Sequence, residues 1–327
     1  MRMNTRMIIC LLITLPWMVP VCSAVDVVSS ASPPPQAPLP APDSEGTTST
    51  ITMGAAKIYL FIEGRPFALS QQELRDWVQR SAEIVLQYYG GFPITESWVA
   101  IRGARGSRVM RGQAIGSVGA VINVDVGLAA TPEALADDWI LVHELIHVAF
   151  PSMARRHHWL EEGLSVYVES IARANAGVLS EDAVWTGFLD GMPLGLPRAG
   201  DKGLDYTPTW GRTYWGGALF CLLADIGIRE QSHGQKTLRD ALRAIVAAGY
   251  NMTRPGDVRT VLAIGDQATG VTVLLDLYEE MHNQPSPATI DSLWSDLGVA
   301  KLDGKIIYDD RAPQATIRRA LTRPASQ

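Results

Sequence analysis

The sequence predicts an α+β protein in which a small N-terminal mixed α/β lobe precedes a mainly helical C-terminal lobe. Strand-like apolar runs and one amphipathic helical segment occupy the chain before residue 131, and helical periodicity dominates after it. Hydrophobic residues make up 47% of the 327 residues, which is enough for a substantial core. Because the net charge is −6 and the basic residues are scattered, nucleic acid is not an expected partner.

The N-terminus has the pattern of a secretory signal peptide over residues 1–24. Arg2 and Arg6 precede an apolar run from Met7 to Val21, and the small residues Ser23 and Ala24 follow at a suitable cleavage point. A membrane span needs roughly 20 apolar residues, so this shorter, proline-interrupted run favours cleavage over retention as an anchor. We therefore expect an exported protein, periplasmic or secreted, with no stable membrane span in the mature chain.

Residues 25–50 are expected to form a flexible, proline-rich linker. The stretch from Ala31 to Thr50, ASPPPQAPLPAPDSEGTTST, is dense in Pro, Ala and Ser and contains almost no large apolar residue. Such a segment cannot bury a core, so it should act as an extended spacer between the export signal and the folded domain.

The N-terminal lobe is predicted over residues 51–130. Its first strand is expected at Lys57 to Glu63, an apolar run rich in β-branched and aromatic residues. Ser70 and Glu73 have capping-box spacing at the start of an amphipathic helix that ends at Gly90. Two further strands, surrounded by glycine-rich loops, are predicted at Glu96 to Gly103 and Gly119 to Gly127.

The C-terminal lobe, residues 131–327, is predicted to be mostly helical. Apolar stretches with helical period occur at Leu135 to Phe150, Leu160 to Ala174, Thr209 to Arg229, Thr237 to Ala248 and Val271 to His282. Within them, the run from Tyr214 to Ile228 is too short for a membrane span and carries Asp225, which favours a buried core helix.

His143, Glu144 and His147 form an H-E-x-x-H motif within the first of these helical stretches. At 3.6 residues per turn the two histidines lie on the same helix face, so both imidazoles can bind one Zn²⁺ ion. Glu144 lies about 100° round the helix, where it can take a proton from a water molecule without binding the metal. The motif predicts a zinc-dependent hydrolase with Glu144 as its base.

A catalytic zinc site normally has three protein ligands and one open position, so a third ligand is required. The longer H-E-x-x-H-x-x-G-x-x-H pattern fails, because Phe150 and Met153 stand where it needs glycine and histidine. The remaining candidates follow shortly downstream: His157, His158, Glu161 and Glu162. The two histidines also belong to a basic group, with Arg155 and Arg156, that is either a solvated loop or a contact for a substrate carboxylate.

The stretch WLEEGLSVYVE, Trp159 to Glu169, resembles the W-L-x-E-G-x-x-x-[YF]-x-E segment of the gluzincin metallopeptidases, the group of aminopeptidase N and the glycyl aminopeptidases. This resemblance implies a two-lobed zincin-like fold with the active site between the lobes. It also implies that Glu162 is the third zinc ligand, that Glu161 occupies the variable place, and that Glu169 could orient a ligand histidine.

The segment TYWGG is similar to the Tyr-x-x-Gly element of the glycyl aminopeptidases. The resemblance implies that the Tyr214 hydroxyl stabilises the developing oxyanion, with Gly217 completing the element. No G-x-M-E-N-like segment precedes the motif, and in aminopeptidase N the glutamate of that segment binds the free amine of the substrate. Amino-terminal trimming is therefore not expected. Ala120 to Val126 is expected instead to form an edge strand along the cleft, to which an extended peptide could add.

The predicted function is that of an exported zinc metallopeptidase acting on a peptide or protein substrate. One Zn²⁺ ion is expected on His143, His147 and Glu162, with Glu144 and Tyr214 as catalytic residues. Two alternatives stay open: a non-catalytic envelope protein braced by zinc, and a zinc hydrolase acting on a non-peptide amide or epoxide. A fourth protein ligand, such as His157 or His158, would favour the structural role.

Overall fold

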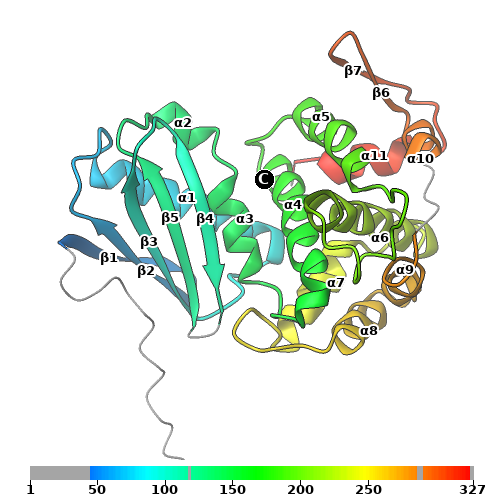
Figure 1. The fold of residues 1–327 in the computed structure, drawn as a ribbon, viewed down its shortest axis with the longest axis horizontal. Helices are drawn as coiled ribbons and strands as arrows, with labels where there is room; N and C mark the ends of the chain where they lie inside the picture. The colour runs from blue at the N-terminus through cyan, green and yellow to red at the C-terminus, as the bar shows by residue number, and fades with distance from the viewer. Residues whose placement is uncertain (1–44, 117–118, 286–289, 325–327) are drawn as a thin grey trace, which may run out of the picture. The chain divides into compact units, whose positions relative to one another are not determined.

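A computed structural model describes residues 45–116, 119–285 and 290–324. The predicted signal peptide, residues 1–24, and most of the predicted linker lie outside these residues. All of the described residues belong to one compact unit of the chain. Their mixed content of one larger sheet and many helices confirms the α+β class (Figure 1).

A mixed five-stranded sheet occupies the first part of the described chain. Its strands, in the spatial order β1-β2-β3-β5-β4, are β1 (Gly46–Met53), β2 (Ala56–Glu63), β3 (Glu96–Ala104), β5 (Ala120–Gly127) and β4 (Val109–Ile115). The three inner strands are parallel, and the two edge strands pair antiparallel with their neighbours. The inner strands are rich in buried Val and Ile, which alternate with less buried side chains such as Tyr59, Trp98 and Asn123.

Helix α1 (Gln71–Tyr89) matches its prediction at both ends. Ser70 accepts a hydrogen bond from the Glu73 backbone N–H, and the Glu73 carboxylate accepts one from the Ser70 N–H, which completes the capping box. Gly90 ends the helix with φ 77°, a left-handed conformation that glycine adopts without strain. The helix contacts β1, α3 and α4, so it joins the sheet to the helical region.

Strand β1 begins inside the segment that the sequence predicts as linker. Residues 46–50 pair with β2, and Arg75 of α1 donates to the Ser49 hydroxyl at 2.9 Å and the Thr50 carbonyl at 2.7 Å. These positions are exposed and polar, so they lack the apolar signal of a strand, although threonine favours extended structure. The folded region therefore starts earlier than predicted.

The edge strand was also predicted in the wrong place. Ala120 to Val126 lies in β5, which pairs with β3 on one side and β4 on the other, so it has no free edge. Most of its residues are buried, as expected of an inner strand. The edge strand is β4, in a segment that the sequence predicts as a glycine-rich loop.

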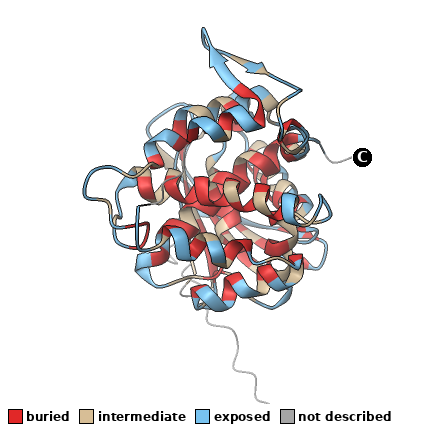
Figure 2. Cartoon of the chain, turned by 90° about the vertical axis from the view of Figure 1, so that its right-hand side faces the viewer, coloured by how far each residue is buried: buried red, intermediate tan, exposed pale blue. Residues whose placement is uncertain are grey.

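The rest of the chain is mainly helical. Its α-helices are α2 (Pro132–Ala136), α3 (Ile140–His147), α4 (His158–Asn175), α5 (Glu181–Gly191), α6 (Gly217–Gln231), α7 (Leu238–Ala247), α8 (Val258–Thr269), α9 (Val273–Met281), α10 (Ile290–Leu297) and α11 (Ala315–Thr322). A π-helical turn (Arg212–Gly216) leads into α6, and a hairpin of β6 (Val299–Leu302) and β7 (Lys305–Tyr308) precedes α11. Figure 2 shows buried positions along the inward faces of these helices and exposed positions along the outward ones. Within the described residues, none of the helices has the length and apolar character of a membrane span.

The predicted helical stretch from Leu135 to Phe150 is two helices. Asp138 stands between them and accepts hydrogen bonds from the backbone N–H groups of Ile140 at 3.0 Å and Leu141 at 3.1 Å. These are N–H groups that the first turn of a helix leaves unpaired, so the carboxylate fixes where α3 starts. The starting point of α3 in turn determines which residues of the motif face α4.

Helices α4 and α6 cross at a point where two glycines meet. A Cβ atom on Gly163 would lie 2.2 Å from the Cα and carbonyl carbon of Gly217, and one on Gly217 would lie 2.1 Å from the Trp159 carbonyl oxygen. The close approach packs Trp159 of α4 edge-on against Phe220 of α6, with ring centroids 5.3 Å apart. Gly163 therefore sets the distance between the two helices next to Glu162.

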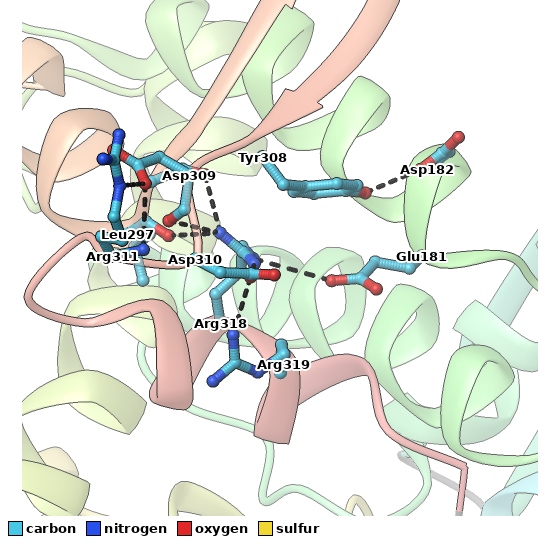
Figure 3. A network of polar contacts seen from close by, with 10 residues as sticks. Glu181, Asp182, Leu297, Tyr308, Asp309, Asp310, Arg311, Arg318 and Arg319 are labelled. Atoms are coloured by element: carbon cyan, nitrogen blue, oxygen red, sulfur yellow. Dashed lines mark hydrogen bonds and ion pairs between the residues drawn. The ribbon is translucent and has the colours of Figure 1, made fainter.

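A buried arginine joins the last helix to the hairpin (Figure 3). Arg318 of α11 donates to the carbonyl oxygens of Leu297 at 3.0 Å and Gly298 at 2.7 Å, and it pairs with the Asp310 carboxylate. Its guanidinium also lies 4.6 Å from the centroid of the Tyr308 ring. Arg318 is 2% exposed, so its buried charge needs these partners, and the bonds hold α11 against the hairpin.

Replacing Gly163 by alanine should lower the stability of the fold. The new methyl group would overlap the α6 backbone, and overpacking of this kind typically costs about 1–3 kcal/mol. We expect thermal unfolding, followed by circular dichroism, to show a midpoint several degrees lower.

Gly187→Ala is the matched control, because a Cβ on this exposed residue of α5 meets no atom within 4 Å. It should leave stability unchanged or raise it by about 0.5–1 kcal/mol through the better helix propensity of alanine. Equal midpoints for the two variants would contradict the tight α4–α6 crossing.

Candidate active site

Three side chains from two neighbouring helices bring their ligand atoms together. His143 and His147 extend from α3, one turn apart, and Glu162 extends from the first half of α4. The His143 Nε2 atom lies 3.3 Å from the His147 Nε2 atom and 3.3 Å from the Glu162 Oε2 atom. The third side of this triangle, from His147 Nε2 to Glu162 Oε2, is 3.5 Å.

These distances suit a zinc ion. Zinc binds histidine nitrogen and carboxylate oxygen at about 2.0–2.1 Å in tetrahedral geometry, which separates neighbouring ligand atoms by about 3.3–3.4 Å. The observed separations of 3.3–3.5 Å match that spacing, and two imidazoles with one carboxylate are a ligand set of catalytic zinc sites. Within the described residues, no other group of three or more His, Cys, Asp or Glu side chains is placed to hold a metal ion.

Glu162 is held as a carboxylate by the histidines around it. Burial alone would raise the pKa of this group, but hydrogen bonding and charge from His143 and His147 lower it far below its ordinary value. The exposed His158 contacts the other oxygen of the same carboxylate, with its Nε2 atom 3.2 Å from Oε1. His158 is not a member of the ligand group.

Two other candidate ligands have different partners. Glu161 points toward the connection between the helices, where its Oε1 atom accepts a hydrogen bond from the Met153 backbone N–H at 3.1 Å. His157 is buried, and its Nδ1 atom lies 2.9 Å from the Asp205 carboxylate. A fourth protein ligand would favour a purely structural metal site, and the described residues supply none in this group.

Asp205 fixes the start of α4. Its Oδ1 atom accepts from the indole N–H of Trp159 at 2.7 Å as well as contacting His157, and its Oδ2 atom accepts from the Tyr278 hydroxyl at 3.3 Å. Its backbone N–H donates to the His282 carbonyl at 2.9 Å. These bonds tie the first turn of α4 to α9, so the helix that carries Glu162 has a defined position. The sequence gives no sign of this role.

Glu144 lies beside the ligand group under strand β4. A Cβ atom on Gly112 would lie 2.5 Å from the Glu144 Cγ atom, so only glycine lets the strand pass this close to the carboxylate. Burial raises the pKa of Glu144, and the nearby His147 opposes that effect. Sequence reasoning missed Gly112, although a glycine inside a strand often marks a close backbone approach.

Tyr214 reaches the same site from the π-helical turn before α6. Burial and the charges of Glu162 and Glu144 raise the pKa of its hydroxyl to about 12, so the phenol keeps its proton and can donate a hydrogen bond. Trp210 stacks on the Tyr214 ring with a centroid distance of 5.9 Å. The structure thus brings Tyr214 together with the motif residues, as the resemblance implies.

Glu169 does not orient a ligand histidine. Its carboxylate accepts from Arg173 at 2.7 Å and from the Ser170 hydroxyl at 3.0 Å. Glu169 is two helical turns beyond Glu162 on α4. Arg173, one turn beyond Glu169, compensates the buried charge of the Glu169 carboxylate. The Nδ1 atom of His143 is buried without a hydrogen-bond partner among the described residues.

A cavity of about 590 Å³ contains the site. Strand β4 lines it with Met110 to Ala114, and the described residues also include Trp139, Phe150, Ser152 and Met252 in its walls. Among the described strands β4 pairs with β5 alone, and the backbone of its Ala114 also bonds to the Glu144 carboxylate. The cavity therefore combines a buried carboxylate, a candidate metal-ligand group and an edge strand.

Comparisons with known proteins show likeness at the level of structure. No protein-family model matches the chain, and no curated protein matches it. Its fold is similar to that of an aminopeptidase N family protein from Idiomarina loihiensis, with a TM-score of 0.57 and 15% identity over 78% of this chain and 49% of that one.

An M1 zinc metallopeptidase from Deinococcus radiodurans matches with a TM-score of 0.47 and 16% identity, over 75% of this chain and 54% of that one. The chain thus spans about half the length of the solved structures it matches. At such low identity, the likeness to the Idiomarina protein shows a shared fold and nothing finer.

Proposed function

We propose that this protein is a zinc metallopeptidase with a two-lobed zincin-like fold. The observation that carries the proposal is the triangle of His143, His147 and Glu162, with sides of 3.3–3.5 Å, in the wall of a 590 Å³ cavity. The fold shared with an aminopeptidase N family protein supports the same reading. The open strand edge beside the site supports a peptide as the substrate.

The chain's own residues have separate parts in the proposed reaction. His143, His147 and Glu162 bind the ion, which when present would polarise the scissile carbonyl and lower the pKa of a water molecule. Glu144, beside the ligands and outside their triangle, accepts a proton from the attacking water and passes it to the leaving amine. Tyr214 donates a hydrogen bond to the oxygen on which negative charge develops.

We propose that the substrate binds as an extended strand along β4 and is cut internally. Backbone N–H and C=O groups on the free edge of β4 can pair with a peptide in any sequence context. The cavity-lining part of β4 carries Arg111 and Gln113 and has no carboxylate to bind a free amino terminus. This arrangement favours endopeptidase action over removal of N-terminal residues.

The rim of the cavity favours large apolar side chains in the substrate. Met110 and Trp139 line the cavity and are 44% and 49% exposed. Trp210 is outside the lining but stacks on Tyr214, which is part of it, and is 62% exposed. Large apolar side chains exposed around one cavity are typical of a binding surface. We propose that they bury an aromatic or aliphatic residue next to the scissile bond.

We also propose that the enzyme is exported to the periplasm or secreted. The signal-peptide pattern of residues 1–24 supports this location. N-terminal sequencing of the protein from its native host should then begin after Ala24.

Glu162→Ala should abolish zinc binding, because two histidines alone do not make the three-ligand set of a catalytic site. Metal analysis of purified protein should fall from about one zinc per chain to near none. Glu161→Ala is the matched control and should retain zinc, since Glu161 bonds to Met153 outside the ligand group. Loss of zinc from the control alone would transfer the ligand role to Glu161.

Glu144→Gln should keep zinc and lose hydrolysis. The amide has nearly the shape of the carboxylate but cannot accept a proton, so kcat on a cleavable peptide should fall by about 100-fold or more. Zinc content, measured on the same sample, serves as the control. Unchanged kcat with bound zinc would exclude Glu144 as the base.

Trp139→Ala should weaken selection for apolar substrates. We expect kcat/KM for peptides with Phe or Leu at the scissile bond to fall by roughly 10-fold, with a smaller change for Gly or Ala. Tyr206→Ala is the control, because Tyr206 is 59% exposed but lies outside the cavity lining. An equal loss for both peptide classes would argue against a role of the rim in specificity.

A further inference from the structure

A second cavity, of about 310 Å³, lies where several helices meet. Tyr88 near the end of α1, Asn175 at the end of α4, Arg229 of α6 and Arg239 near the start of α7 line it, together with Arg323 just beyond α11. Its lining shares no residue with the active-site cavity. Along α4, Asn175 is 13 residues from Glu162, which corresponds to about 20 Å.

The ends of α4 and α11 are bonded to each other at this cavity. The Asn175 side-chain N–H group donates to the carbonyl oxygens of Leu321 and Arg323, each at 3.0 Å. Arg318 fixes α11 to the hairpin on its other side, as Figure 3 shows. The cavity wall is thus built from anchored segments.

The buried acid in the cavity wall already pairs with one of the arginines. Asp225 is 2% exposed, and its Oδ1 atom accepts from Arg229 Nε at 2.9 Å and from the Leu238 backbone N–H at 3.1 Å. Its Oδ2 atom accepts from the Tyr167 hydroxyl at 3.0 Å. Asp225 therefore neutralises Arg229, and no bond or ion pair joins it to a second described arginine.

Two other arginines of the cavity have no acidic partner among the described residues. Arg239 makes neither an ion pair nor a side-chain hydrogen bond there, and its guanidinium lies 5.8 Å from the centroid of the Tyr88 ring. The side chain of Arg323 likewise has no described ion pair. With Arg229 balanced by Asp225, the cavity has an excess of two positive charges.

A buried hydroxyl in the wall also lacks a partner. Tyr88 is 2% exposed, and its hydroxyl makes no hydrogen bond among the described residues. Burial raises the pKa of this hydroxyl. The hydroxyl is also close enough to Asp225, Arg239 and Arg229 for their charges to affect that pKa. A phenol donor left unpaired in a protein interior lowers stability, and an acceptor in the cavity would remove that cost.

We propose that this cavity is a binding site for a small phosphate-bearing anion. Guanidinium groups pair with phosphate oxygens through two parallel hydrogen bonds, and the Tyr88 hydroxyl supplies a further donor. The volume of 310 Å³ lies at the lower end of the range for small-molecule sites, so it suits inorganic phosphate or a small phosphomonoester. A bound anion would join the ends of α1, α4, α6, α7 and α11.

Calorimetric titration of the full mature chain with inorganic phosphate tests this site, with glycerol 3-phosphate in a second series. We expect saturable binding with one site per chain, and a thermal midpoint roughly 3 °C higher at ten times the dissociation constant. Sodium chloride at the same ionic strength should give no such rise. A rise equal to that in chloride would overturn the proposal. Tighter binding of glycerol 3-phosphate would assign the site to phosphomonoesters, and tighter binding of inorganic phosphate to the free ion.

Two variants locate the binding. Arg239→Gln should weaken phosphate binding by 10-fold or more, and Tyr88→Phe should weaken it several-fold while the fold stays intact. Arg311→Gln removes the same charge from a side chain that is 93% exposed and not part of the cavity lining, and it should bind phosphate normally. Unchanged affinity in both cavity variants would place the phosphate elsewhere, including on the metal centre, and would overturn the proposal.

Discussion

The crossing of α3 and α4 is the constraint on which the rest of the structure depends. It brings two imidazole nitrogens and a carboxylate oxygen within 3.5 Å of one another in a largely buried site, where unpaired polar groups are costly. The surrounding structure fixes the positions of both helices. Asp138 fixes the first turn of α3, Asp205 fixes the first turn of α4, and the two meeting glycines set the distance from α4 to α6.

The same crossing explains why the acidic residues of α4 have unequal surroundings. Glu162 faces α3 and the two histidines, whereas its neighbour Glu161 is turned toward the Met153 backbone. Glu169 lies deeper in the helical region, where Arg173 compensates its charge. Helical geometry thus gives three carboxylates of one segment different surroundings: Glu162 joins the candidate ligand group, Glu161 bonds to the connection before α4, and Glu169 pairs with Arg173.

Local patterns predicted much of the fold and of the ligand group. The capping box of α1, the inner strands and the helical period around the motif depend on neighbouring residues, and they were recovered from the sequence. Strand β4 was missed because Arg111, Gly112 and Gln113 break the apolar pattern, and its pairing is set by β5. The pairing of Asp205 with His157 joins residues 48 positions apart, and local patterns contain no information on such contacts.

The π-helical turn before α6 has a consequence for how this region tolerates insertions and deletions. A π turn contains one residue more than an α turn, and each added residue rotates the following side chains by about 100°. Loss of one residue from Arg212–Gly216 would restore regular winding, but it would turn Tyr214 away from Glu162 or Phe220 away from the core. The length of this short segment is therefore fixed by two requirements at once.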